Sequence, residues 1–147
     1  MKPLIFLVLF LMVSVMMVVS CENRPLVVNP DLESNKRKWV DSKIVDYDFE
    51  VTKDHGNWMP SNIRVKGGKA VSKQPLDEKG ELGLIEEYDD FETVEKIFDS
   101  IQNFYNKEYR VEVKYNESLG YPERVLFDHG KSTDSVVIIG IRKFDVR

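Results

Sequence analysis

The chain has 147 residues, with 21 basic and 25 acidic side chains and a formal net charge of −4 at pH 7. This length favours a single domain, and the acidic balance argues against a nucleic-acid partner, because phosphate binding requires a basic face. Cys21 is the only cysteine, so no disulfide within the chain can stabilise the fold.

The first twenty residues have the features of an export signal. Lys2 gives a short, positively charged start, and residues 4–19 are apolar except for Ser14. An apolar span this short is more typical of a signal peptide than of a membrane-spanning helix. We therefore predict that residues 1–20 are a lipoprotein signal peptide that is removed.

The residues before Cys21 resemble the lipobox of bacterial lipoproteins, because Val18-Val19-Ser20 places aliphatic and small residues directly before the cysteine. The resemblance implies a diacylglyceryl thioether on Cys21, with acyl chains such as palmitate, and two or more such chains anchor stably. The expected location is the bacterial cell envelope, lipid-anchored to a membrane and facing the periplasm or exterior. The alternatives are an uncleaved signal anchor and an ordinary signal peptide that leaves a free thiol.

Residues 21–30 are expected to form a tether, because prolines interrupt them and they keep no periodic pattern. Residues 31–147 then form a single domain. A short helix is expected from Asp31, which can cap it, with Leu32 and Trp39 on a shared face.

Alternation of apolar and polar residues predicts the first strands. Residues 45–52 (VDYDFEVT) place valine and aromatic side chains on one face and acids on the other. Residues 63–71 are typical of a hairpin with Gly67-Gly68 at its tip. Residues 72–90 are predicted to be a long acidic loop, because they combine proline and glycine with many carboxylates.

The strongest helical pattern begins at Thr93, a good capping residue, and runs to about Tyr105. Its apolar residues recur at spacings of three and four; they are Val94, Ile97, Phe98, Ile101, Phe104 and Tyr105. We predict that this stripe packs in the core.

The last third of the chain is predicted to be β-structure. Residues 109–115 alternate, residues 116–122 turn the chain, another strand begins at Val125, and residues 136–141 are apolar on both faces, as in a central strand. The expected fold class is therefore α+β: an antiparallel sheet of five or six strands with one amphipathic helix packed on one face, after the signal and the short helix.

Several short motifs occur in the same order in a known family. They are Trp39, Asp46-Tyr47, the hairpin from Val65 to Val71, Thr93-Val94-Glu95, and Tyr115-Asn116-x-x-x-Gly120-Tyr121-Pro122. This order resembles a family of uncharacterised bacterial lipoproteins, catalogued only as a domain of unknown function. The resemblance runs from about Trp39 to Phe144, and its most specific motif is the Y-N/D-x-x-x-G-Y-P turn. It implies a fold and a location, and it brings no activity, cofactor or catalytic residue.

The turn motif is the first candidate for a site. Gly120 permits a sharp backbone bend, and Pro122 fixes φ and removes a hydrogen-bond donor. Tyr121 can then pack across the strand ends. We interpret Gly120, Tyr121 and Pro122 as a structural turn in preference to a ligand-binding loop.

Residues suited to catalysis or metal binding are sparse, since the sequence has no Gly-x-Ser-x-Gly motif, no second thiol and no His-x-x-x-His pair. We therefore expect no cofactor, metal ligand or catalytic residue, and favour a monomeric, non-enzymatic binding or envelope-associated module. Its expected partners are the membrane, through the lipid anchor, and an envelope protein or peptide. The alternative is a small hydrolase or metal-dependent enzyme that combines His55 or His129 with acids of the 77–95 loop.

Overall fold

The computed structural model describes residues 29–54, 60–75, 91–130 and 136–147. The predicted signal peptide, Cys21, His55 and residues 77–90 of the acidic loop lie outside these ranges. The described residues form helices α2 (Pro30–Ser42) and α3 (Val94–Asn106) and strands β1 (Tyr47–Asp54), β2 (Ser61–Lys66), β3 (Lys69–Pro75), β4 (Arg110–Tyr115), β5 (Pro122–Asp128) and β6 (Val136–Val146). Neither of these two helices is long and apolar enough to span a membrane.

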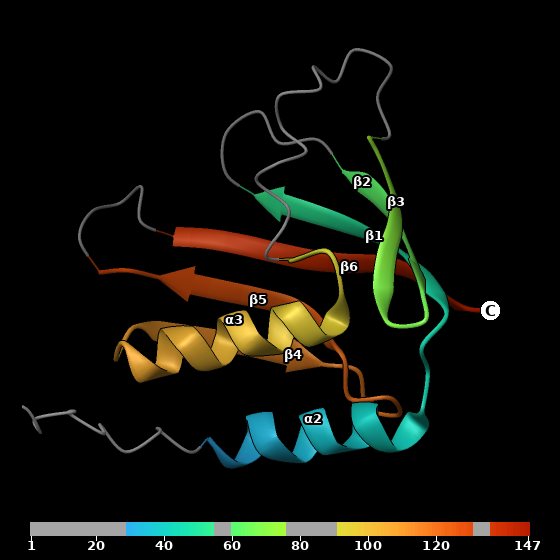
Figure 1. The fold of residues 1–147 in the computed structure, drawn as a ribbon. Helices are drawn as coiled ribbons and strands as arrows, with labels where there is room; N and C mark the ends of the chain where they lie inside the picture. The colour runs from blue at the N-terminus through green and yellow to red at the C-terminus, as the bar shows by residue number, and fades with distance from the viewer. Residues whose placement is uncertain (1–28, 55–59, 76–90, 131–135) are drawn as a thin grey trace, which may run out of the picture.

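The strands form one antiparallel sheet in the order β3-β2-β1-β6-β5-β4. Strands β1 to β3 pair with their neighbours in sequence, as do β4 to β6, and the two three-stranded units join where β1 pairs with β6. Helix α3 packs on β4 and β5, and α2 lies beside it (Figure 1). Both helices therefore belong to one layer of the molecule.

The predicted fold class, α+β with a single helix packed on a sheet of five or six strands, is wrong. The described residues are mostly sheet, with six strands and two helices. Two features account for the difference. Leu32 and Trp39 are buried, so α2 belongs to the core and does not merely precede it. Strand β6 also continues to Val146 through exposed Arg142 and Lys143, because its backbone keeps pairing with β1 beyond the apolar run.

The capping residue predicted for α2 is wrong, whereas the one predicted for α3 is confirmed. Asn29, and not Asp31, caps α2, and its Oδ1 accepts hydrogen bonds from the backbone N–H groups of Asp31 and Leu32. Pro30 takes the first helical position, where its missing N–H costs nothing. In α3, the Thr93 hydroxyl accepts from the N–H of Lys96 at 3.2 Å, as a capping residue should.

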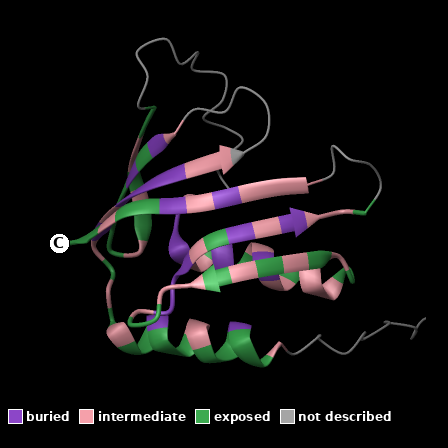
Figure 2. Ribbon diagram, turned by 180° about the vertical axis from the view of Figure 1, so that it is seen from behind, coloured by how far each residue is buried: buried purple, intermediate pink, exposed green. Residues whose placement is uncertain are grey.

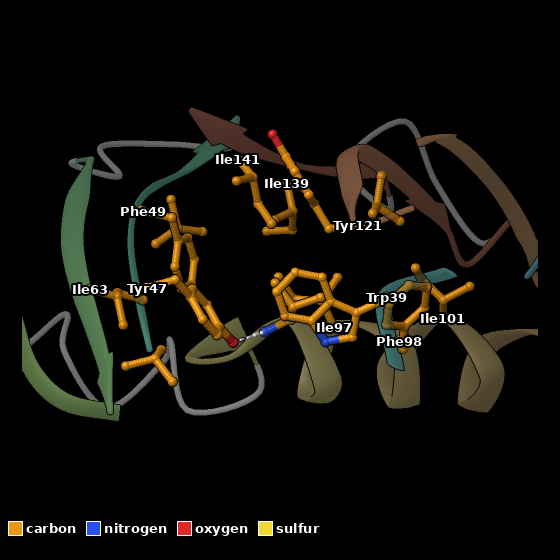
Figure 3. Packing of buried hydrophobic residues seen from close by; sticks show 14 of the residues in the cluster. Trp39, Tyr47, Phe49, Ile63, Ile97, Phe98, Ile101, Tyr121, Ile139 and Ile141 are labelled. Atoms are coloured by element: carbon orange, nitrogen blue, oxygen red, sulfur yellow. Dashed lines mark hydrogen bonds between the residues drawn. The ribbon is translucent and has the colours of Figure 1, made fainter. Parts of the chain in front are cut away.

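The core lies between the helices and one face of the sheet (Figure 3). In β2 every second residue is buried. In β1 the predicted apolar residues Tyr47, Phe49 and Val51 are buried, but Glu50 between them is buried as well. Side chains of α3 complete this layer; the buried ones are Val94, Ile97, Phe98 and Ile101. On the opposite face of the sheet, no described helix lies over the strands (Figure 2). We call this the outer face.

Candidate functional site

A half-buried carboxylate, that of Glu95, joins both helices to the sheet. The indole Nε1 of Trp39 in α2 donates to Glu95 Oε1 at 2.7 Å, and the hydroxyl of Tyr47 in β1 donates to Glu95 Oε2 at 3.1 Å. The Tyr47 oxygen in turn accepts from the N–H of Val94 at 3.0 Å (Figure 3). Burial raises the pKa of Tyr47 well above its usual value, so the phenol keeps its proton and remains a donor.

Aromatic rings pack around Trp39 and Tyr47, the two side chains that donate to this carboxylate. Trp39 makes edge-on contacts with Tyr47 at 5.3 Å and with Phe144 at 5.8 Å between ring centroids. Tyr121 of the turn motif stacks on Phe144 at 4.3 Å. Trp39 and Tyr47 are buried completely and Tyr121 almost completely, so this group of residues stabilises the fold and offers no surface to a ligand.

The turn between β4 and β5 packs closely against α2. Gly120 has a φ of +77°, and a Cβ at this position would collide with the carbonyl oxygen of Asn35 and lie 2.9 Å from Cβ of Lys38. The side chain of Asn116 folds over the turn, and its Oδ1 accepts from the N–H of Leu119 at 2.9 Å. The structure therefore places Gly120 and Tyr121, followed by Pro122 at the start of β5, in a tight turn between α2 and the sheet.

The histidine and acids of the enzyme alternative are separated where the structure describes them. His129 packs on Phe104, with 4.8 Å between the ring centroids, near the end of α3. Glu92 and Glu95 lie at the start of α3, and Glu92 forms ion pairs with Lys73 at 2.6 Å and Lys96 at 2.5 Å. No group of three His, Cys, Asp or Glu side chains within the described ranges can hold a metal ion. His129 is thus not brought together with either acid.

The ion pairs of Glu92 set its charge. Burial alone would raise the pKa of this carboxyl, but hydrogen bonds from the Lys73 and Lys96 ammonium groups outweigh that effect and lower it. Glu92 is therefore a carboxylate at neutral pH, and the two ammonium groups balance its negative charge. A carboxyl group that has already lost its proton does not suit the role of a general acid.

The outer face has a shallow depression of about 290 Å³ where four strands meet. Gly140 of β6 lies between Arg124 of β5 and Thr52 of β1 in the cross-strand register, and Lys114 of β4 is opposite Arg124. Arg142 follows two residues after Gly140 and so points to the same side. The lining residues are Thr52, Lys114, Glu123, Arg124, Ile138, Gly140, Ile141 and Arg142. We call this depression the Gly140 hollow.

The missing side chain of Gly140 keeps the hollow open. A Cβ at residue 140 would lie only 2.7 Å from Oγ1 of Thr52, closer than a real contact allows. The same hydroxyl donates to the carbonyl oxygen of Gly140 at 3.3 Å, so the Thr52 side chain lines the floor of the hollow. Glycine inside a strand commonly marks such a close approach.

The two arginines of the hollow carry charges that the described part of the chain does not neutralise. Neither Arg124 nor Arg142 makes a side-chain hydrogen bond or ion pair with another described residue, and both are exposed. Lys114 pairs with Glu123 at 3.1 Å. Hydrogen bonds from Asn116 and Lys114 lower the pKa of Glu123, so this carboxylate remains charged beside Lys114.

Two acidic residues elsewhere on the outer face, Glu50 and Asp48, already have cationic partners. Glu50 is opposite Arg142 in the register, but its carboxylate is held by Lys143 at 2.7 Å. A second groove, of about 220 Å³, contains Asp48, which pairs with Arg64 at 3.2 Å and with Arg147. Hydrogen bonds from these two arginines, chiefly Arg147, lower the pKa of Asp48. The Gly140 hollow is therefore the better candidate for a charged ligand.

The residues of the Gly140 hollow were not among the site residues predicted from the sequence. The alternation in β1 and β4 indicated a solvent-facing side, but it could not show which charges of distant strands become neighbours. The one local signal is Gly140 itself, the only glycine within the apolar run from Val136 to Ile141. A glycine in such a run indicates a bulge or a close approach.

Comparison with known proteins places the chain in one family. The model of a family described only as a family of unknown function matches residues 31–146, which is most of the chain. No curated protein matches the sequence, and no solved structure matches the fold.

Gly120 and Gly130 provide a matched test of the contact between the turn and α2. Both have a positive φ, +77° and +67°, but only Gly120 would place a Cβ against neighbouring atoms. Gly130→Ala should cost only the strain of the left-handed backbone, about 1–2 kcal/mol. Gly120→Ala should cost about 1–3 kcal/mol more, because the new methyl group displaces α2. Denaturant unfolding measures both losses; equal losses would mean that the turn does not press on the helix.

Proposed function

The chain belongs to DUF6174, a family of unknown function, over residues 31–146, and from this premise we propose that the protein is a lipid-anchored, non-enzymatic binding module of the bacterial cell envelope. The lipobox-like residues Val18-Val19-Ser20 before Cys21 support the anchor. The Tyr115 to Pro122 motif supports the likeness to uncharacterised bacterial lipoproteins. The mature chain faces the periplasm or exterior and has the membrane as its first partner.

The proposed organisation suits a displayed domain. Residues 1–20 are removed, residues 21–30 tether the chain, and residues 31–147 form one domain. Ten extended residues span at most roughly 35 Å. The domain therefore stays close to the membrane surface while it can still turn its outer face toward a partner.

The outer face is the proposed binding surface, and one observation supports this choice. Arg124 and Arg142 are exposed there without a partner among the described residues, although the protein as a whole is acidic. Arginine is enriched in protein interfaces, because its planar guanidinium group binds carboxylates and phosphates in a fork-like geometry. Half-buried Leu126 and Ile138 pair beside the hollow and add apolar area to the surface.

The lipid anchor predicts how Cys21→Ser should behave. The variant should lose labelling by a fatty-acid analogue and should leave the membrane fraction or accumulate as an unprocessed precursor, because serine provides no thiol for the thioether. Ser20→Ala, which keeps a small residue before the cysteine, is the control and should label normally. A wild-type chain that takes up no fatty acid would contradict the anchor.

Site-specific crosslinking in intact cells tests the binding surface. A photo-reactive phenylalanine analogue at Leu126, on the outer face, should give a covalent adduct with a cellular partner. The same analogue at Asn103, an exposed position of α3, is the matched control and should give little or none. Equal yields at the two positions, or no adduct at Leu126, would contradict the assignment of the outer face.

A further inference from the structure

We propose that the Gly140 hollow binds a phosphoryl group, an inference that rests on the proposed binding function and names the class of ligand. The hollow combines two guanidinium groups that no described side chain neutralises, those of Arg124 and Arg142, with the hydroxyl of Thr52 on the floor. These are the donor types that recognise phosphate oxygens in proteins.

The charge of the hollow favours an anion. Its lining contains three cationic side chains and one carboxylate, and that carboxylate, Glu123, pairs with Lys114 at the rim. The positive charge of Arg124 and Arg142 is therefore left for a ligand. Both side chains rise from the same face of adjacent strands, since Arg124 is opposite Gly140 and Arg142 lies two residues further along β6.

The size of the hollow suits one charged group of a ligand. Its volume of about 290 Å³ lies at the lower limit for pockets that enclose small molecules, about 300–1,000 Å³. The hollow is open on the outer face, so the remainder of the ligand can extend over the neighbouring strands. Apolar Leu126 and Ile138 lie in the next cross-strand row.

The number of donors favours a phosphoryl group over a carboxylate. A carboxylate has two oxygens, which a single guanidinium can satisfy in a bidentate pair. Two separate guanidinium groups and a hydroxyl match the four oxygens of a tetrahedral phosphate, which are three terminal oxygens and one ester oxygen in a monoester, or two of each in a diester. The Thr52 hydroxyl can turn toward such a ligand, because its present hydrogen bond to the Gly140 carbonyl is long, at 3.3 Å.

The phosphoryl group can come from a phospholipid headgroup or from a soluble phosphomonoester, and two probes separate these sources. The full chain in non-ionic detergent and phosphate-free buffer is titrated with glycerol 3-phosphate and, separately, with monomeric dihexanoyl-phosphatidylglycerol. Calorimetry gives the affinity, and NMR of the arginine Nε–H groups identifies the contacts. Tighter binding of the lipid assigns a headgroup, and tighter binding of glycerol 3-phosphate assigns a soluble ligand; both results support the proposal.

The variants make the test specific. Arg124→Gln combined with Arg142→Gln should weaken binding at least about tenfold, because both charge-assisted contacts are lost. Arg110→Gln is the control: it removes a cation from the outer end of β4, where Arg110 already pairs with Glu112, and it should change affinity less than about twofold. Unchanged thermal melting of each variant excludes unfolding, as expected for exposed side chains.

Three outcomes would overturn the proposal: no binding of either probe, equal weakening by Arg110→Gln, or binding of acetate as tight as that of glycerol 3-phosphate. The crosslinking experiment at Leu126 distinguishes a wrong ligand class from a wrong binding surface. If the Leu126 probe gives its specific adduct but neither phosphoryl compound binds, only the ligand class is wrong. If the Leu126 probe gives no specific adduct, the binding surface itself is wrong.

Discussion

The Glu95 carboxylate is the contact on which the arrangement of the layers depends. It accepts hydrogen bonds from Trp39 of α2 and from Tyr47 of β1 while belonging to the first turn of α3. Three elements that are distant in sequence thus meet at one side chain. A carboxylate is also stabilised near a helix N-terminus, where the backbone N–H groups point outward. Leaving a buried indole or phenol donor without a partner costs about 1–3 kcal/mol each, so alternative placements of α2 and α3 are disfavoured.

Both described helices lie on one side of the sheet, and no helix among the described residues covers the other side. Gly120 allows the β4–β5 turn to approach α2 closely, which holds that helix at the lower edge of the core. The pairing of β1 with β6 then joins the two halves of the sheet and brings Thr52 beside Gly140. The Gly140 hollow therefore follows from the topology: its floor comes from strands that are far apart in the chain. Arg124 and Arg142 are exposed on this outer face, opposite the layer that contains the buried aromatic residues.

The sequence predicted those features that depend on neighbours along the chain. The period of two in β1 and the stripe in α3 were read correctly, because each pattern reports burial on one side of one element. The fold class was wrong, because the apolar pattern of α2 is too short to show that Trp39 is central, and because β6 keeps pairing after its apolar run has ended. Glu95 was visible only as part of a motif. Neither its two partners nor the Gly140 hollow could be predicted, since both depend on register and packing between distant segments.

A double-mutant cycle on Glu95 and Trp39 measures whether Glu95 couples α2, β1 and α3. Glu95→Ala should lower the free energy of unfolding by about 2–4 kcal/mol, since two donors lose their acceptor. Asp99→Ala removes another carboxylate of α3, whose ion pair with Lys36 of α2 is exposed to solvent, and should cost no more than about 1 kcal/mol. In a Trp39→Phe background, which keeps an aromatic ring but lacks the N–H donor, Glu95→Ala should cost at least about 1 kcal/mol less than in the wild type. Equal losses of unfolding free energy in the two backgrounds would contradict the coupling between Glu95 and Trp39, because Glu95 would then act without the Trp39 N–H group.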